Sequence, residues 1–131
     1  SAMTLDGPEL RRGISKDLDF SFEGRGENLR RATEIAKIIN QSGLICLISI
    51  VAPSETVRQK AASSMDADSF FVIHLDPDAS TLEQRTVDKE SPEITYEPPV
   101  QARMKIDTGS QSVLESTNQV FDLLKQEGFL L

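Results

Sequence analysis

The sequence predicts an α/β fold in which helices cover both faces of a parallel sheet, giving three layers. The run from Leu44 to Pro53 is apolar and contains many β-branched residues. It does not alternate with polar residues, which is typical of a strand buried on both faces. Segments with strand patterns and helix patterns also alternate along the chain, and this order favours right-handed crossovers between parallel strands.

The first quarter of the chain predicts a strand, a short helix and a loop. The segment 4–7 has the pattern of a short strand ending in a turn, and Pro8 begins a helix that Gly13 stops. The stretch 14–24 is expected to be a loop. It carries Phe20 and Phe22 among polar residues, so these rings either plug the core or offer a stacking surface, and core is the default interpretation.

The middle of the chain predicts a long helix followed by the central strand. Apolar residues recur at helical spacing from about Gly26 to Gln41, and Ser42-Gly43 ends the pattern. The apolar run 44–53 is the next strand, and Ser54 is expected to cap a helix that reaches about Ser64. Ligands of open parallel sheets bind beyond the carboxyl ends of the strands, so the end of this run marks the expected site.

The second half predicts two more strands and two more helices. The expected elements, in order, are a strand (70–76), a helix beginning at Pro77, a proline-rich loop (88–101), a short strand (104–107) and a final helix capped by Ser110 and ended by Gly128. His74 is the only histidine and has no neighbouring cysteine in the sequence. We therefore expect no metal site.

Length and composition limit the class of protein. The 131 residues suit a single domain, 4–131, with residues 1–3 as a tag remnant and a start at Met3. The sequence shows no signal peptide and no membrane-spanning run, which predicts a cytoplasmic protein. Cys46 is the only cysteine and is expected to be a small core residue.

Charge is unevenly distributed along the chain. The net charge is −7, which argues against binding to nucleic acid. The first 31 residues hold six acidic and six basic groups, and five of the basic groups are arginines. Arginine makes forked contacts to phosphate and sulfate. A small-anion site in this region is one interpretation; arginines paired with neighbouring carboxylates are the other.

Six stretches of the first 53 residues stand out together: Thr4-Leu5-Asp6-Gly7, Leu10-Arg11-Arg12-Gly13, Asp19-Phe20-Ser21, Arg25-Gly26-Glu27-Asn28-Leu29-Arg30-Arg31, Ala36-Lys37 and Gly43-Leu44-Ile45-Cys46. In these stretches the chain resembles adenylylsulfate kinases, P-loop enzymes of sulfate assimilation that use ATP to phosphorylate adenosine 5′-phosphosulfate (APS). Later stretches, among them Glu83-Gln84-Arg85 and Tyr96-Glu97-Pro98-Pro99, follow in the family's order.

The resemblance implies a nucleotide site but not a complete kinase. It assigns APS, or its 3′-phosphorylated product PAPS, to these residues: Arg11, Phe20, Arg25, Asn28, Val51 and Ala52. Arg58 lies outside this set, so its substitution is expected to change binding little. The family also uses ATP and Mg²⁺, but none of the seven glycines begins G-x-x-x-x-G-K-[ST], the motif that cradles phosphates.

Further departures from the family imply a truncated or degenerate member. The second carboxylate of the family's Asp-Gly-Asp turn is Pro8, the serine expected at the end of the strand is Ala52, and the lid between Arg85 and Tyr96 is short and mostly polar. The first strand, P-loop and first helix of the family are expected to be missing. We therefore expect no catalytic residues, no metal and no cofactor in this chain, as in a pseudoenzyme.

A missing first strand would leave the centre of the sheet open. In this topology that strand lies between the run 44–53 and the strand 70–76, and its absence exposes backbone hydrogen-bonding groups. A homodimer, or a partner chain covering the edge, is the expected outcome; internal re-pairing is another. Three functions stay open: a nucleotide-binding domain without turnover, a subunit completed by a separate P-loop, and an interaction scaffold.

Overall fold

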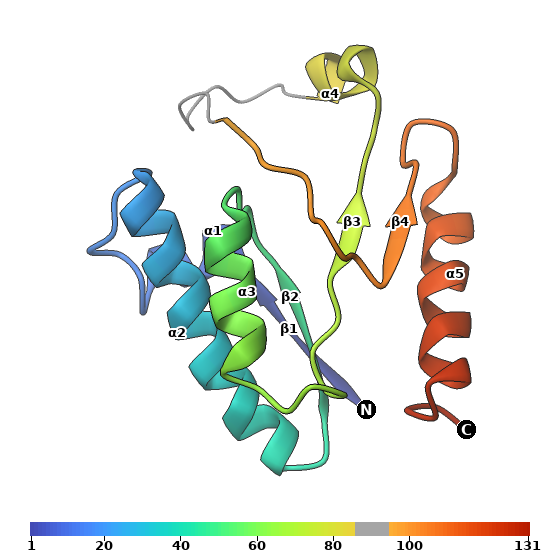
Figure 1. Cartoon of the computed structure of the whole chain (residues 1–131), viewed down its shortest axis with the longest axis horizontal. Coiled ribbons are helices and arrows are strands. Elements are labelled where there is room, and N and C mark those ends of the chain that lie inside the picture. The colour runs from blue at the N-terminus through green and yellow to red at the C-terminus, as the bar shows by residue number, and fades with distance from the viewer. Residues whose placement is uncertain (86–94) are drawn as a thin grey trace. The chain divides into compact units, whose positions relative to one another are not determined.

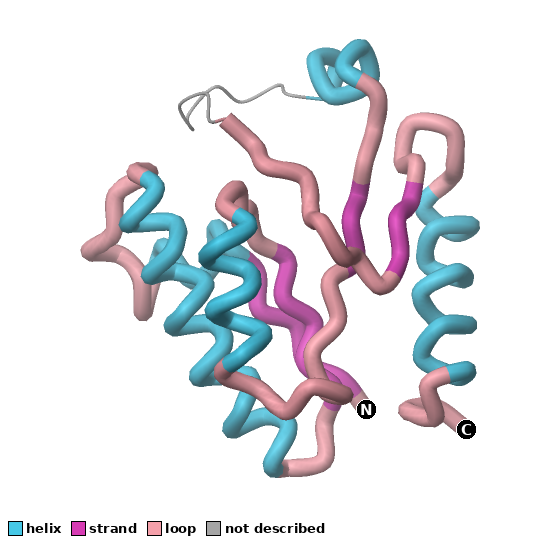
Figure 2. Tube along the Cα trace, viewed as in Figure 1, coloured by secondary structure: helices cyan, strands magenta, loops and turns pink. Residues whose placement is uncertain are grey.

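The computed structural model describes residues 1–85 and 95–131. They belong to two compact units, and each is described by itself. Of the described residues, 1–71 and 95–100 belong to the first unit, and 72–85 and 101–131 belong to the second. Helices and parallel strands make up both units (Figures 1 and 2), so the α/β prediction is confirmed.

The first unit is built on a two-stranded parallel sheet. Strand β1 (Ala2–Asp6) pairs with β2 (Ile45–Ser49), in a register that runs from Ala2 opposite Ile45 to Asp6 opposite Ser49. Because the strands are parallel, both carboxyl ends lie at one edge of the sheet. β1 begins at Ala2, before the Thr4 that the sequence suggested.

Three helices complete this unit: α1 (Gly7–Arg12), α2 (Phe22–Gln41) and α3 (Glu55–Ser63). Figure 1 shows α2 and α3 side by side, and Gly26 allows this approach, since a Cβ there would lie 3.3 Å from the Val57 side chain. The buried apolar side chains of the unit come mainly from these helices: Leu10, Leu29, Ala32, Ala36, Ile39 and Ala61.

Two details of this unit differ from the sequence expectation. Helix α2 starts at Phe22 and not near Gly26, because the Ser21 side chain accepts a hydrogen bond from the Gly24 amide and so caps the helix earlier. Strand β2 is not buried on both faces: Leu47 is 44% exposed, whereas Cys46 and Ile48 are half-buried. Successive side chains of a strand point to opposite faces, so one face of β2 is covered better than the other.

The second unit also contains a parallel pair. Strand β3 (Ile73–Leu75) lies beside β4 (Met104–Ile106), shorter than the segments that the sequence suggested. Helices α4 (Ala79–Arg85) and α5 (Val113–Gln126) follow these strands. Ser112, and not Ser110, caps α5, in a reciprocal pair of hydrogen bonds with Glu115. Of the loop expected over 88–101, residues 88–94 lie outside the described part.

Candidate functional site

Three of the residues assigned by resemblance meet on one side chain. Arg11 lies in the last turn of α1, Phe20 in the loop before α2, and Arg25 in the first turns of α2. The guanidinium carbon of Arg11 is 4.2 Å from the centroid of the Phe20 ring, and that of Arg25 is 5.2 Å from it. Both distances are within the range of cation–π attraction. The three side chains therefore form one cluster, which we call the Phe20 cluster.

Backbone carbonyls hold the two guanidinium groups in place. Nη1 of Arg11 donates to the carbonyls of Leu18 and Asp19, at 3.1 and 3.0 Å. Nε of Arg25 donates to the carbonyl of Phe20 at 3.1 Å. The remaining nitrogens, Nε and Nη2 of Arg11 and both Nη atoms of Arg25, make no hydrogen bond to the described residues. Each guanidinium group has five N–H donors, so both arginines keep donors that a ligand could use.

Arg25 is an unusual cation because it is buried without a carboxylate. Arg25 is only 5% exposed, and no ion pair joins it to any described acidic residue. Burial lowers the pKa of Arg25, and the positive charge of Arg11 lowers it further. A buried cation without a counter-charge costs stability. An anion that reaches this cluster would relieve that cost.

Asn28 lies one helical turn beyond Arg25 and is 2% exposed. Its Oδ1 atom is buried and accepts no hydrogen bond in the described part of the protein. Buried polar atoms in native proteins nearly always have a partner, so such an atom needs an explanation. A hydrogen-bond donor on a ligand would supply the missing partner.

Val51 and Ala52 follow the carboxyl end of β2. Val51 is 53% exposed, and Ala52 is half-buried. Helix α1 starts at the same edge of the sheet, since a Cβ on Gly7 would lie 3.4 Å from the Ile50 side chain. The structure thus places these two residues at the edge where α1, which carries Arg11, begins. Among the described residues, no hydrogen bond from the side chains of Arg11 or Arg25 reaches Val51 or Ala52.

The loop that carries Phe20 is held tightly against α2. The Asp19 carboxylate accepts hydrogen bonds from the amide and hydroxyl of Ser21, which holds its pKa below the ordinary value. Position 24 must be glycine, because a Cβ there would overlap the backbone and side chain of Asp19. Phe20 itself is 37% exposed, so this loop leaves it accessible to solvent.

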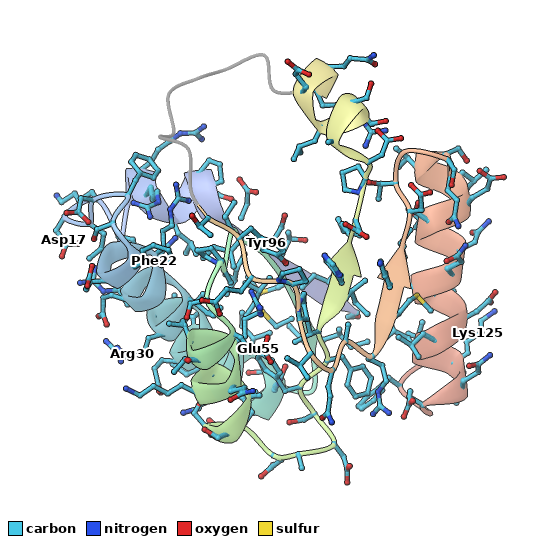
Figure 3. The ribbon with its side chains drawn as sticks, turned by 45° about the horizontal axis from the view of Figure 1, so that its top comes forward. Asp17, Phe22, Arg30, Glu55, Tyr96 and Lys125 are labelled. Atoms are coloured by element: carbon cyan, nitrogen blue, oxygen red, sulfur yellow. The ribbon has the colours of Figure 1, made fainter. Side chains whose placement is uncertain are left out.

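A second group of arginines lies beside this loop and has carboxylate partners. Arg31 makes a forked contact with Asp17, at 2.6 and 2.9 Å, and also contacts Glu27 at 3.0 Å. Arg30 makes a second fork with Glu27, at 2.8 Å for each bond. Figure 3 labels Asp17 and Arg30 on this side of the unit. We call these four residues the Arg31 network.

The Arg31 network borders a shallow hollow that does not suit an anion. The residues that line the hollow are Asp17, Leu18, Asp19, Ser21, Glu23, Gly24 and Glu27. Hydrogen bonds from Arg31 lower the pKa of Asp17 to about 2, and those from Arg30 and Arg31 lower the pKa of Glu27 to about 2. These carboxylates are charged at neutral pH and already have partners. The hollow is therefore not the anion site.

Sequence reasoning missed the role of Arg58. It placed this residue outside the site as a neutral reference, but the structure shows Arg58 6% exposed and bonded to the carbonyl of Ala52. The sequence gives no signal that this arginine will be buried, because two of its partners, the carbonyls of Ala52 and Glu97, lie outside its own helix. Arg58 is consequently unsuitable as a control.

Neither a metal-binding cluster nor a membrane-spanning helix occurs in the described part of the chain. No group of three His, Cys, Asp or Glu side chains in them could hold a metal ion. None of the helices within residues 1–85 and 95–131 has the length and apolar character needed to cross a membrane. Cys46 is half-buried on β2, and burial raises the pKa of its thiol.

Comparison with known proteins identifies the family. The family model "Adenylylsulphate kinase" matches residues 1–113. The chain belongs to the adenylylsulphate kinase family. The bifunctional enzyme CysN/CysC of Rhodopirellula baltica is 36% identical over 99% of this chain, and the adenylyl-sulfate kinase of Lactiplantibacillus plantarum is 32% identical over 96% of it.

Solved structures agree with this assignment. The Mycobacterium tuberculosis APS kinase CysC, in complex with AMPPNP and APS, superposes with a TM-score of 0.81 at 29% identity, covering 95% of this chain and 80% of that one. A hexameric APS kinase from Thiobacillus denitrificans gives 0.75 at 27% identity, over 99% of this chain and 23% of that one. The chain spans 22% of the Rhodopirellula baltica protein and 67% of the Lactiplantibacillus plantarum kinase.

Proposed function

We propose that this member of the family binds an adenine nucleotide carrying a phosphosulfate group, APS or PAPS, at the Phe20 cluster. One observation carries the proposal: the guanidinium groups of Arg11 and Arg25 both contact the Phe20 ring, and neither has a carboxylate partner among the described residues. Forked guanidinium groups match the oxygens of phosphate and sulfate. Phe20 is 37% exposed, and its ring would stack on the base of the nucleotide.

The other assigned residues would orient the nucleotide. The Asn28 amide has an oxygen without a partner, so it would take a hydrogen bond from the ligand. Val51 and Ala52, at the carboxyl end of β2, would line the site on the sheet side, where ligands of parallel sheets bind. These two assignments rest on the family resemblance and on the position of β2, and they remain proposals.

We propose further that these 131 residues alone do not transfer a phosphoryl group. Positioning and charge stabilisation account for nearly all catalysis in phosphoryl transfer. The sequence contains no phosphate-cradling G-x-x-x-x-G-K-[ST] motif, and Pro8 stands where a second carboxylate is expected. Binding of ATP and Mg²⁺ is accordingly not expected of this chain.

Calorimetric titration with APS, PAPS and AMP tests the binding proposal. Charge-assisted contacts are worth about 1.5–3 kcal/mol, so Arg25→Ala should weaken APS binding by about tenfold or more. Arg12→Ala is the matched control: it removes the same charge from the same region, but Arg12 is exposed and has no contact with Phe20. Wild-type protein with no heat and no thermal shift at millimolar nucleotide would refute nucleotide binding and leave the scaffold role.

A second function is favoured by the strand edges. Among the described residues, β2 pairs only with β1 and β3 pairs only with β4, so each sheet has only two strands. We propose that a strand and P-loop from another segment or another chain could pair with one of these edges and restore kinase activity. A coupled assay with ATP and APS should give no turnover with this chain alone. Magnesium-dependent turnover that follows the purified chain would show that no such segment is needed.

Open strand edges also bear on assembly. Unpaired backbone N–H and C=O groups of an edge strand tend to pair with another chain. We propose a homodimer, or a complex in which a partner covers an edge. Sedimentation equilibrium should show the assembly; a monomer that stays soluble at high concentration would exclude a stable dimer.

A further inference from the structure

Helix α3 carries a buried arginine, Arg58, near the turn that links it to β2, and every guanidinium nitrogen of this residue makes a hydrogen bond. Nη1 of Arg58 donates to the carbonyl of Ala52, and Nη2 donates to the carbonyl of Glu97. Nη2 and Nε also contact the Glu55 carboxylate, at 2.7 and 3.2 Å. Arg58 thus joins three segments: the end of β2, the first turn of α3 and the stretch around Glu97. The pairing with Arg58 lowers the pKa of Glu55.

Glu97 completes the connection from the other side. Its amide donates to the Pro53 carbonyl at 2.8 Å, and its carboxylate accepts from the Glu55 amide at 2.9 Å. Ser54 occupies the N-cap position of α3 but makes no side-chain capping bond. A residue 42 positions further along the chain therefore satisfies a helix N-terminus that the local serine leaves open.

A ring contact also holds the segment 95–100. The guanidinium carbon of Arg58 lies 5.4 Å from the centroid of the Tyr96 ring, within the range of cation–π attraction. Figure 3 labels Tyr96 and Glu55 in this part of the first unit. The segment forms neither helix nor strand, so these contacts, and not a backbone ladder, determine where it lies.

We propose that Arg58 and Glu97 form a clasp that docks the segment 95–100 on the β2–α3 turn and makes Arg58 a positioning residue for the nucleotide site. The positioning role of Arg58, unlike the clasp itself, rests on the proposed function. Arg58 holds the Ala52 carbonyl and so fixes the end of β2. Its neighbour Val57 packs on Gly26, next to Arg25, so the clasp also supports the helix that carries Arg25.

Tyrosine fluorescence can report on the clasp without any ligand. Tyr96 is the only tyrosine and the chain has no tryptophan, so tyrosine emission comes from this segment alone. Arg58→Lys should raise acrylamide quenching of Tyr96, because an ammonium group cannot span two carbonyls and a carboxylate as a planar fork does. Glu97→Ala should do the same, and because Glu97 is exposed this variant keeps the core intact. Lys60→Ala, an exposed cation on the same helix, should leave quenching unchanged.

APS titration of the same variants tests the positioning role. At a temperature where circular dichroism shows each variant folded, Arg58→Lys and Glu97→Ala should weaken APS binding by roughly three- to tenfold. Unchanged quenching in both variants would overturn the clasp. Raised quenching with an unchanged dissociation constant would overturn the positioning role. Absence of APS binding by the wild type would refute the proposed function and this role together, while quenching still decides whether the clasp exists.

Discussion

Two groups of arginines in the first 31 residues have opposite surroundings. In the Arg31 network, Arg30 and Arg31 share Glu27, and Arg31 also binds Asp17 and the Ile14 carbonyl. In the Phe20 cluster, Arg11 and Arg25 meet a ring and backbone carbonyls but no carboxylate among the described residues. The same residue type is thus used once with counter-charges and once without them.

The difference separates a structural role from a binding role. Arg31 ties the loop before α2 to the helix, and its donors are used in doing so. Arg25 uses one donor for the loop and leaves the others available in a buried place where a lone cation is unfavourable. The paired group fixes the loop that carries Phe20, and the unpaired group keeps donors for an anion.

The largest expected effect comes from disturbing the loop that carries Phe20. Gly24→Ala would place a Cβ against Asp19, whose carbonyl accepts from Arg11 and whose position sets that of Phe20. Overpacking of this kind costs about 1–3 kcal/mol of stability. We expect a lower free energy of unfolding in urea and weaker APS binding. Glu23→Ala, one residue earlier and exposed, is the control. Equal stability of Gly24→Ala and wild type would show that the loop can move away at little cost.

The next effect distinguishes the two groups. Arg31→Ala should lower Tm, because it removes the forked bond to Asp17 and the bond to the Ile14 carbonyl. Arg25→Ala should lower Tm less, since it removes a buried cation that Arg11 repels, yet it should weaken APS binding more. Differential scanning fluorimetry with and without APS measures both quantities. If Arg25→Ala has the larger loss of Tm and no effect on APS, Arg25 is structural as well.

The sequence predicted the order of elements because strand and helix periodicity is local. It placed α2 four residues late, since Gly24 and Gly26 suggest a loop while the Ser21 cap acts through one hydrogen bond. The cap of α3 could not be foreseen, because Glu97 reaches it from a distant segment. The resemblance named Arg11, Phe20 and Arg25, which the fold brings together. Tertiary contacts decide which arginines have carboxylate partners, so this distinction could be made only from the structure.

A smaller effect should appear when pH changes. The folded-state pKa values of Asp17 and Glu27 are about 2, below the ordinary values of 3.8 and 4.5. Groups with a lowered folded pKa contribute stability above the unfolded pKa and lose it as pH falls toward the folded value. The Tm difference between wild type and Asp17→Asn should therefore be constant from pH 7 to 5 and shrink toward pH 2. A difference that persists at pH 2 would mean that Asp17 acts through something other than its charge.

The smallest expected effect concerns the ring in the Phe20 cluster. Phe20→Leu keeps an apolar side chain but removes the π face that Arg11 and Arg25 share, and cation–π contacts at exposed sites are worth about 0.5–1 kcal/mol each. Stability should fall slightly, because the carbonyl bonds of Arg11 and Arg25 to the loop remain. Binding of APS should fall more than binding of inorganic sulfate, since the ring would stack on adenine whereas the arginines alone would bind the anion. Phe22→Leu, another exposed phenylalanine two residues along the chain, is the matched control. Equal losses for APS and sulfate would place the base away from Phe20 while leaving the arginines as the anion site.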